Sequence, residues 1–153
     1  MTLSELLQQP TFASVEQRTL LNVMASSSWI SSLISDGLQP HGLTPAQYNV
    51  LRILRGKHPE SHTCSAIGSR LIDRTPDVTR LLIRLESRDL ISRRRADHDR
   101  RVVEVRITDE GLALLATVEE PMSRAYEIAT EHLSEEEMEQ LCDLLERFRT
   151  NQR

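Results

Sequence analysis

Apolar residues recur at steps of three and four along most of this chain, a spacing typical of amphipathic helices. The pattern predicts helices over residues 15–38, 45–55, 64–72, 75–88, 109–132 and 134–149. Between the fourth and the fifth helix the period falls to two, so that apolar and polar residues alternate. This alternation predicts two strands, over residues 90–94 and 102–108, joined as a hairpin. The fold class that we expect is therefore mainly α with a small β-hairpin (α+β).

Thr-Pro pairs mark the starts of two predicted helices. In Thr75-Pro76 and in Thr44-Pro45 the threonine hydroxyl can cap the helix. The proline suits the first helical position because its missing N–H needs no partner there. A further proline, Pro121, lies inside the helix predicted over 109–132. Because proline removes a backbone hydrogen bond, we expect a kink or a restart of the helix at this point.

The helix predicted over 75–88 has one apolar side and one side rich in arginine. Its apolar stripe consists of Val78, Leu81, Leu82 and Leu85. Arg80, Arg84 and Arg88 repeat every fourth residue and so share a face of the helix. Such a helix can pack on a core while it directs guanidinium groups at phosphate or guanine. The alternative is a solvated face on an ordinary helix, and the neighbouring segments decide between the two.

Those neighbouring segments favour DNA binding. Only a tight turn at Asp73-Arg74 separates the helix from the shorter helix before it. This spacing is typical of a helix-turn-helix motif, whose second helix enters the major groove. The loop between the predicted strands, residues 95–101, is polar and rich in arginine, which indicates a wing that reaches the adjacent minor groove. The alternative is a solubilising hairpin of mutually paired Asp and Arg, and Asp99 is placed to hold the guanidinium of Arg101 extended.

The distribution of charge supports a polyanionic partner, although the whole chain carries a net charge of −4. Residues 64–108 contain 11 arginines and 7 acidic residues, so this segment carries +4 and the rest of the chain −8. Local charge decides where a polyanion binds. We therefore expect double-stranded DNA to be the partner of this segment.

The length and composition suit a single domain with an aliphatic core. The chain has 153 residues, of which 39% are hydrophobic and only 3% aromatic. No apolar run approaches the roughly 18 residues needed to span a bilayer. The segment Met1 to Pro10 lacks the basic start and apolar core of a signal peptide. We therefore expect a cytoplasmic protein without a membrane partner, and its two cysteines to be reduced.

The outer predicted helices carry more apolar surface than the middle of the chain can cover. A partner must cover the remainder, and the commonest partner is a second copy related by two-fold symmetry. A dimer also places two recognition helices about one DNA turn apart, as a palindromic operator requires. We therefore expect a homodimer.

Several short motifs follow one another along the chain in a defined order. They are Leu43-Thr44-Pro45-Ala46-Gln47-Tyr48, Thr75-Pro76-Asp77-Val78-Thr79-Arg80-Leu81-Leu82, Arg84-Leu85-Glu86, Asp89-Leu90-Ile91, Asp99-Arg100-Arg101 and Ile107-Thr108-Asp109-Glu110-Gly111. Together with the order of the elements, they resemble the MarR family of bacterial transcriptional regulators over about residues 15–149. The resemblance implies a winged-helix homodimer that binds a pseudo-palindromic operator, usually as a repressor. It also implies that ligand binding or thiol oxidation releases the homodimer from the operator.

The resemblance also implies how the chain is divided. It predicts one MarR-type domain over residues 1–153. Within this domain, a winged helix-turn-helix lobe of about 39–108 would bind DNA. Residues of about 10–38 and 109–149, which include the first and last helices, would form a helical dimerisation region.

Carried over residue by residue, the resemblance places the start of the recognition helix in the major groove and Arg101, paired with Asp99, in the minor groove. Ile83 stands where the family often has a polar residue, so its base contact would be apolar, as with a thymine methyl group. Asp89 stands where glycine is common. The complete set of candidate DNA-binding residues is Arg74, Thr75, Pro76, Asp77, Thr79, Arg80, Ile83, Arg84, Arg94, Arg95, Asp99, Arg100 and Arg101.

The sequence leaves the kind of effector open. By resemblance, a small phenolic or amphipathic ligand would bind between the dimer helices and the DNA-binding lobe, against Trp29, His41 and Tyr48. A thiol-responsive regulator of the same fold would use Cys64, because the start of a helix can lower the pKa of a thiol. Cys142, on the apolar last helix, fits an interface or a core instead.

Two further functions are alternatives to a ligand- or thiol-responsive DNA-binding regulator, namely a metal-responsive regulator and a protein-docking module. A metal-responsive regulator would use His58, His62 and Cys64, but their spacing matches no standard zinc pattern, so we assign no metal site. A winged helix that docks proteins would bind no DNA and would be indifferent to the loss of Arg101. The chain lacks a glycine-rich phosphate loop and a nucleophile elbow, so we expect neither an enzyme nor a cofactor.

Overall fold

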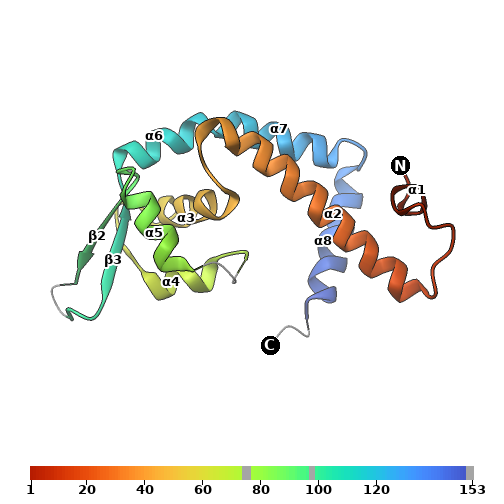
Figure 1. Ribbon diagram of the computed structural model, residues 1–153, viewed down its shortest axis with the longest axis horizontal. Coiled ribbons are helices and arrows are strands. Elements are labelled where there is room, and N and C mark those ends of the chain that lie inside the picture. Colours follow the sequence, from red (N-terminus) through yellow and green to blue (C-terminus); the bar gives the residue numbers. More distant parts are fainter. Residues whose placement is uncertain (74–76, 97–98, 151–153) are drawn as a thin grey trace.

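The computed structural model describes residues 1–73, 77–96 and 99–150. Helices make up most of it, with a small antiparallel sheet at one end (Figure 1), and this confirms the expected fold class. The helices are α1 (Leu3–Leu7), α2 (Val15–Leu38), the 3-10 helix η1 (Gln39–His41), α3 (Pro45–Arg55), α4 (Cys64–Arg70), α5 (Val78–Glu86), α6 (Asp109–Thr117), α7 (Glu119–Thr130) and α8 (Glu135–Phe148). The strands are β1 (His62–Thr63), β2 (Ile91–Arg95) and β3 (Val103–Ile107).

Side-chain caps fix where several helices begin. Helix α3 starts at the Thr44-Pro45 pair, as the sequence predicts. The Thr44 hydroxyl accepts from the Gln47 backbone N–H at 3.2 Å, and the Gln47 side-chain oxygen accepts from the Thr44 N–H at 3.0 Å. This reciprocal pair satisfies two backbone donors that the first turn leaves without a helical partner. The cap therefore fixes the point at which the segment after α2 ends and α3 begins.

The small sheet packs against both helices of the helix-turn-helix motif, because β2 contacts α5 while β1 and β3 contact α4. Its strand order is β1-β3-β2, and both pairs are antiparallel. Val105, in the central strand, is fully buried and lies opposite His62 on one side and Arg93 on the other. The core beneath the sheet is aliphatic and includes Val50, Leu51, Leu54, Ile67, Leu82 and Leu85.

The helix predicted over 109–132 is two helices, which confirms the restart that Pro121 suggested. Helix α6 ends at Thr117 and α7 begins at Glu119. Pro121 lies in the first turn of α7, where its missing N–H needs no helical acceptor. Helices α6 and α7 follow one another along one edge of the molecule, and α7 packs against α2 (Figure 1).

Helices α2, α7 and α8 each leave several large apolar side chains exposed. Helix α8 has no buried residue, although its sequence repeats leucine and phenylalanine at helical spacing. The exposed apolar side chains of α2, α7 and α8 include Leu20, Met24, Trp29, Ile30, Tyr126, Ile128, Leu141, Leu144 and Phe148. The single chain therefore carries the uncovered apolar surface that the sequence predicts.

The recognition helix is shorter than predicted at both ends. Helix α5 begins at Val78, because the Asp77 carboxylate caps it by accepting from the Arg80 backbone N–H at 3.2 Å. The predicted cap, Thr75-Pro76, lies outside the described residues. The helix ends at Glu86, and Asp89 then has a φ of 56°, in the left-handed region that ends helices. Arg88 consequently lies beyond the helix and does not continue the face of Arg80 and Arg84.

Short elements also differ between the prediction and the structure. Helix α4 ends at Arg70, two residues before its predicted end, because Leu71 has an extended backbone. Helix α1 and strand β1 were not predicted: five and two residues are too few to show a period.

Candidate nucleic-acid interface

Helix α5 separates an apolar inner side from a polar outer side. Leu81, Leu82 and Leu85 are buried against the core. The described candidate residues on and before this helix lie on its outer side, namely Asp77, Thr79, Arg80, Ile83 and Arg84. All five of these residues are exposed. The three candidates that precede them, Arg74, Thr75 and Pro76, lie outside the described residues.

Ile83 is the apolar member of the outer side. It is 49% exposed, although it lies only one residue from the buried Leu82. The exposed isoleucine gives the outer side an apolar point next to the two cations Arg80 and Arg84. Such a point suits the methyl group of thymine, which projects into the major groove.

The arginines of the segment fall into two groups. Within the described residues, no carboxylate pairs with the guanidinium groups of Arg80, Arg84, Arg95, Arg100 and Arg101. In contrast, Arg93 pairs with Glu86 of α5, and Arg94 donates to Glu104 of β3 at 3.1 Å. The first group can therefore meet an anion without first breaking an ion pair, whereas Arg93 and Arg94 hold the hairpin in place.

The tip of the hairpin is shaped by Asp99. Its carboxylate accepts from the Arg101 backbone N–H at 2.9 Å, and its carbonyl accepts from the Val102 N–H at 2.9 Å. Asp99 therefore contacts the backbone of Arg101, and not the guanidinium as the sequence suggested. Ala96, at the other side of the tip, is buried, while Arg100 and Arg101 are exposed.

Helix α5 and the hairpin lie side by side at the same end of the molecule (Figure 1). The ion pair between Glu86 and Arg93 joins them directly, through an Nε-to-Oε2 bond of 2.9 Å and a second bond from Nη2. This pairing, with Glu86 accepting both bonds, lowers the pKa of Glu86. The helix and the hairpin that carry the exposed arginines are thereby joined to one another.

The three residues proposed to line a ligand site make separate contacts. Trp29 is 48% exposed on α2. His41 Nδ1 lies 3.1 Å from the Thr117 hydroxyl of α6. Tyr48 has the Arg52 guanidinium over its ring at 5.8 Å, and burial together with the neighbouring Tyr126 raises the pKa of Tyr48. Their role in ligand binding stays a prediction.

A groove of about 400 Å³ lies where α2, the start of α3 and the segment after α4 meet. Its lining is mostly apolar and includes Ile34, Ala46, Leu71 and Ile72. Asn49 adds a polar group and accepts from the Ile72 backbone N–H at 3.0 Å. None of the three predicted ligand residues lines this groove. Residues far apart in the sequence form it, so that spacing along the chain could not predict it.

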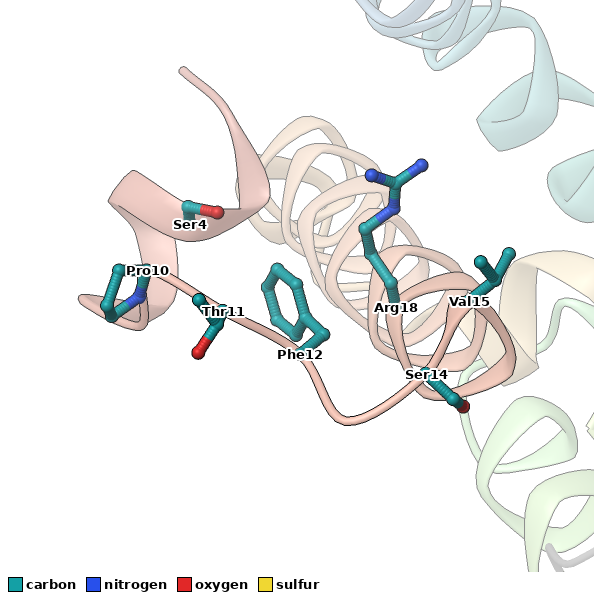
Figure 2. Close-up of a pocket in the computed structure, with 7 residues that line it drawn as sticks. All are labelled: Ser4, Pro10, Thr11, Phe12, Ser14, Val15 and Arg18. Atoms are coloured by element: carbon teal, nitrogen blue, oxygen red, sulfur yellow. The ribbon is translucent and has the colours of Figure 1, made fainter.

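A second hollow, of about 440 Å³, lies between α1 and the first turns of α2. Figure 2 shows Phe12 in the linking segment and Arg18 on α2 beside this space. It lies at the opposite end of the molecule from the β2–β3 hairpin (Figure 1). It therefore has no direct part in the interface formed by α5 and the hairpin.

Two of the proposed thiol and metal residues, His62 and Cys64, make contacts within the fold, whereas His58 is exposed. His62 is buried, its Nε2 lies 3.3 Å from the Arg70 guanidinium, and burial together with the positive charges of Arg70 and Lys57 lowers its pKa. The Cys64 thiol faces the Val103 carbonyl at 4.0 Å. In the described ranges, no three His, Cys, Asp or Glu side chains are grouped as metal ligands. Nor does any described helix have the length and hydropathy to cross a membrane.

Comparisons with known proteins agree with this geometry. The MarR family model matches residues 43–103. The chain is 31% identical over 108 residues to the homoprotocatechuate degradative operon repressor of Escherichia coli, over 71% of this chain and 72% of the repressor. The regulator MhqR of Bacillus subtilis is 28% identical over 122 residues, which cover 80% of this chain and 83% of MhqR.

Solved structures show the same relationship. A MarR transcription factor from Planctomyces limnophilus is 37% identical, with a TM-score of 0.70 over 89% of this chain and 98% of that one. A mutant of Escherichia coli MarR complexed with operator DNA is 25% identical, with a TM-score of 0.74 over 82% of this chain and 89% of that one. The α5 and hairpin geometry and these likenesses agree: the chain belongs to the MarR family of transcriptional regulators.

Proposed function

We propose that this protein is a homodimeric repressor that binds a pseudo-palindromic operator in double-stranded DNA and leaves it when a small aromatic or amphipathic ligand binds. The observation that carries the proposal is the set of exposed arginines on α5 and on the adjacent hairpin that pair with no carboxylate among the described residues. Membership of a family of transcriptional regulators favours this reading over an enzyme.

The two parts of the interface suit the two grooves of DNA. Helix α5 presents Arg80, Ile83 and Arg84 on its outer side. An α-helix fits into the major groove, and these side chains suit the base edges exposed there. The hairpin projects beyond the helix with Arg100 and Arg101 at its tip, and a narrow minor groove attracts arginine. Relatives support this use: one structure of Escherichia coli MarR is a complex with operator DNA, and MdtR of Bacillus subtilis is a repressor.

A second copy of the chain is the partner that we propose for the exposed apolar surface. The uncovered side chains of α2, α7 and α8 would form the dimerisation region together with its partner. Two-fold symmetry would then present two α5 helices to two half-sites of one operator. The division into a DNA-binding lobe of about 39–108 and a dimerisation region of about 10–38 and 109–149 is part of this proposal, as is action in the cytoplasm, where the chromosome lies.

The apolar groove between α2 and the start of α3 is the effector site that we propose in addition to Trp29, His41 and Tyr48. Its volume of about 400 Å³ and its mostly apolar lining suit one small aromatic molecule. A ligand there would contact both a helix of the dimerisation region and the segment that leads into α5. One relative is the repressor of a homoprotocatechuate degradative operon, which favours an aromatic ligand class.

Fluorescence anisotropy tests the proposal. Labelled DNA from the region upstream of the protein's own gene and a random duplex of equal length are titrated at several salt concentrations. We expect binding to the upstream DNA to be at least about 1,000-fold tighter and to weaken steeply with salt. Equal binding to both duplexes would contradict an operator in this region, and no binding would favour a protein-docking module. Phenolic acids, peroxide and zinc are then screened for release of the DNA.

A further inference from the structure

The Arg88 side chain bridges two distant parts of the chain. Its Nη1 donates to the Gly42 carbonyl at 2.6 Å, and its Nη2 donates to the His41 carbonyl at 3.3 Å. These carbonyls lie at the carboxyl end of η1, where backbone oxygens lack helical partners and carry partial negative charge. The forked guanidinium can bind both at once, which a lysine cannot do in the same geometry.

The bridge joins the exit of the recognition helix to the junction between α2 and α3. Arg88 follows α5 by two residues, whereas η1 directly continues α2. Gly42 has a φ of 64° and lies under the guanidinium, so a side chain at this position would be strained. A change in the orientation of α2 would therefore reach α5 through these two hydrogen bonds.

The same turn is also bonded to α6. His41 Nδ1 lies 3.1 Å from the Thr117 hydroxyl, and that hydroxyl donates its one proton to the Leu114 carbonyl at 2.8 Å. The imidazole Nδ1 must therefore be the donor to Thr117. The exit of α5, the turn η1 and helix α6 thus form one continuous set of hydrogen bonds.

The residues that follow Arg88 are fixed from the other side. The Asp89 carbonyl accepts from the Thr108 hydroxyl at 2.6 Å, and the Leu90 carbonyl accepts from the Thr108 N–H at 3.2 Å. A Cβ on Gly111 would lie 2.2 Å from the Leu90 oxygen, so only glycine permits this approach of α6. The segment that leads from α5 to β2 is therefore held between η1 and the start of α6.

We propose that Arg88 is a positioning residue for operator recognition: it binds no DNA, and it sets the orientation of α5 relative to the dimer helices by holding the end of η1. This inference rests on the proposed function. The sequence grouped Arg88 with Arg80 and Arg84, but α5 ends before it and its guanidinium is occupied by two carbonyls. A further hollow, lined in part by Gly42, Leu43 and Thr44 and distinct from the proposed effector groove, borders the same turn.

The proposal predicts an effect on specific binding alone. Specific binding needs both α5 helices in register with two half-sites, whereas non-specific binding depends mainly on positive charge near phosphate. Loss of the Arg88 bridge should therefore weaken the complex with the operator and leave the complex with a random duplex almost unchanged.

The test compares Arg88→Lys and Arg88→Gln with the wild type on the upstream duplex and on a random duplex, over a range of salt. We expect both variants to bind the upstream duplex about tenfold more weakly, the loss expected for one charge-assisted bond, and the random duplex within about twofold of the wild type. The slope of affinity against salt should not change. Hydrogen exchange in the free protein should be faster in residues 41–43 and 87–90 of both variants, with the fold retained.

Other outcomes would overturn the proposal. If Arg88→Lys bound like the wild type while Arg88→Gln lost about one unit of salt slope, Arg88 would be a phosphate contact. Equal weakening on both duplexes, with a lower free energy of unfolding, would mean a role in stability alone. Unchanged hydrogen exchange would show that the bridge does not hold the segment in solution. A wild-type protein without preference for the upstream duplex would count against the proposed function itself, and the wild-type titration reveals this separately.

Discussion

Glu86, the last residue of α5, accepts two hydrogen bonds from the guanidinium of Arg93 in β2. The pair is a direct charged link between the recognition helix and the hairpin. It is partly shielded from water, with side-chain exposures of 38% for Glu86 and 24% for Arg93. The angle between helix and hairpin, and hence the simultaneous use of two DNA grooves, depends on this contact.

Glu86→Gln should lower the free energy of unfolding by about 1 kcal/mol at neutral pH, the upper range for a pair that is partly exposed. Because the bond to Arg93 lowers the pKa of Glu86 in the folded protein, its contribution is complete above the unfolded value of about 4.3. It is lost as the pH falls through the folded pKa. Urea unfolding of both proteins at neutral pH and at acid pH measures this, and the difference between them should vanish in acid. A constant difference at all pH values would contradict the assignment.

Arg84→Ala should weaken operator binding by about 1–3 kcal/mol if the guanidinium makes a bidentate contact with a base. The residue is exposed and has no carboxylate partner among the described residues, so little else in the fold depends on it. Arg124→Ala, which removes the same charge from the exposed side of α7, serves as the control and should bind nearly as the wild type does. Anisotropy titrations on the upstream and random duplexes separate the cases. Equal loss on both duplexes would reduce Arg84 to a phosphate contact.

Arg101→Ala should weaken binding to the upstream duplex while the unfolding transition stays unchanged. The guanidinium projects from a tip that Asp99 holds through the backbone, so the tip keeps its shape when the side chain is removed. Arg94→Ala is the matched variant in the same hairpin, and because Arg94 is bonded to Glu104 its loss should weaken binding less. If Arg94→Ala were the more damaging change, the hairpin would contact DNA through its strand and not through its tip.

The sequence predicted most helices well because their signals are local. Periodic apolar residues and the Thr44-Pro45 pair placed α3, and Pro121 predicted the restart at α7. The start of α5 was predicted wrongly because two residues near it can both act as caps. The Asp77 carboxylate caps the described helix by accepting from the Arg80 N–H, whereas Thr75 lies outside the described residues. Spacing alone cannot choose between competing caps.

The division of the arginines into free and bonded groups could not be predicted from the sequence. Arg80, Arg84 and Arg88 share a four-residue spacing, yet the bridge of Arg88 to Gly42 joins residues 46 positions apart. Arg93 and Arg94 are neighbours in one strand, but their side chains point to opposite faces and meet different carboxylates. The apolar groove was missed for the same reason, since it forms where α2, α3 and the segment after α4 meet.

Leu144→Glu should convert a dimer into a monomer. Leu144 is 57% exposed on α8, a helix with an apolar stripe and no buried residue in the single chain. A charge at the centre of an apolar interface costs several kcal/mol, because it is desolvated without a partner. Light scattering at micromolar concentration measures the mass. Ile72→Glu is the control, because Ile72 is 91% exposed and lies outside α2, α7 and α8. This variant should have the same mass as the wild type. A wild-type monomer, or a dimer that tolerates Leu144→Glu, would contradict this interface.

Asp89→Gly should raise the free energy of unfolding by about 0.5–1 kcal/mol. Asp89 has a φ of 56°, a left-handed conformation in which a side chain is strained and glycine is not. Part of this gain is offset, because glycine also gives the unfolded chain more freedom. Ser87→Gly is the matched control two residues earlier, where φ is −63°. There glycine relieves no strain, and the loss of the serine hydroxyl bond to the Arg84 carbonyl should make the variant less stable. Urea unfolding of the two variants should therefore shift in opposite directions. A shift of both toward lower stability would mean that the Asp89 side chain stabilises the turn by more than its backbone strain costs.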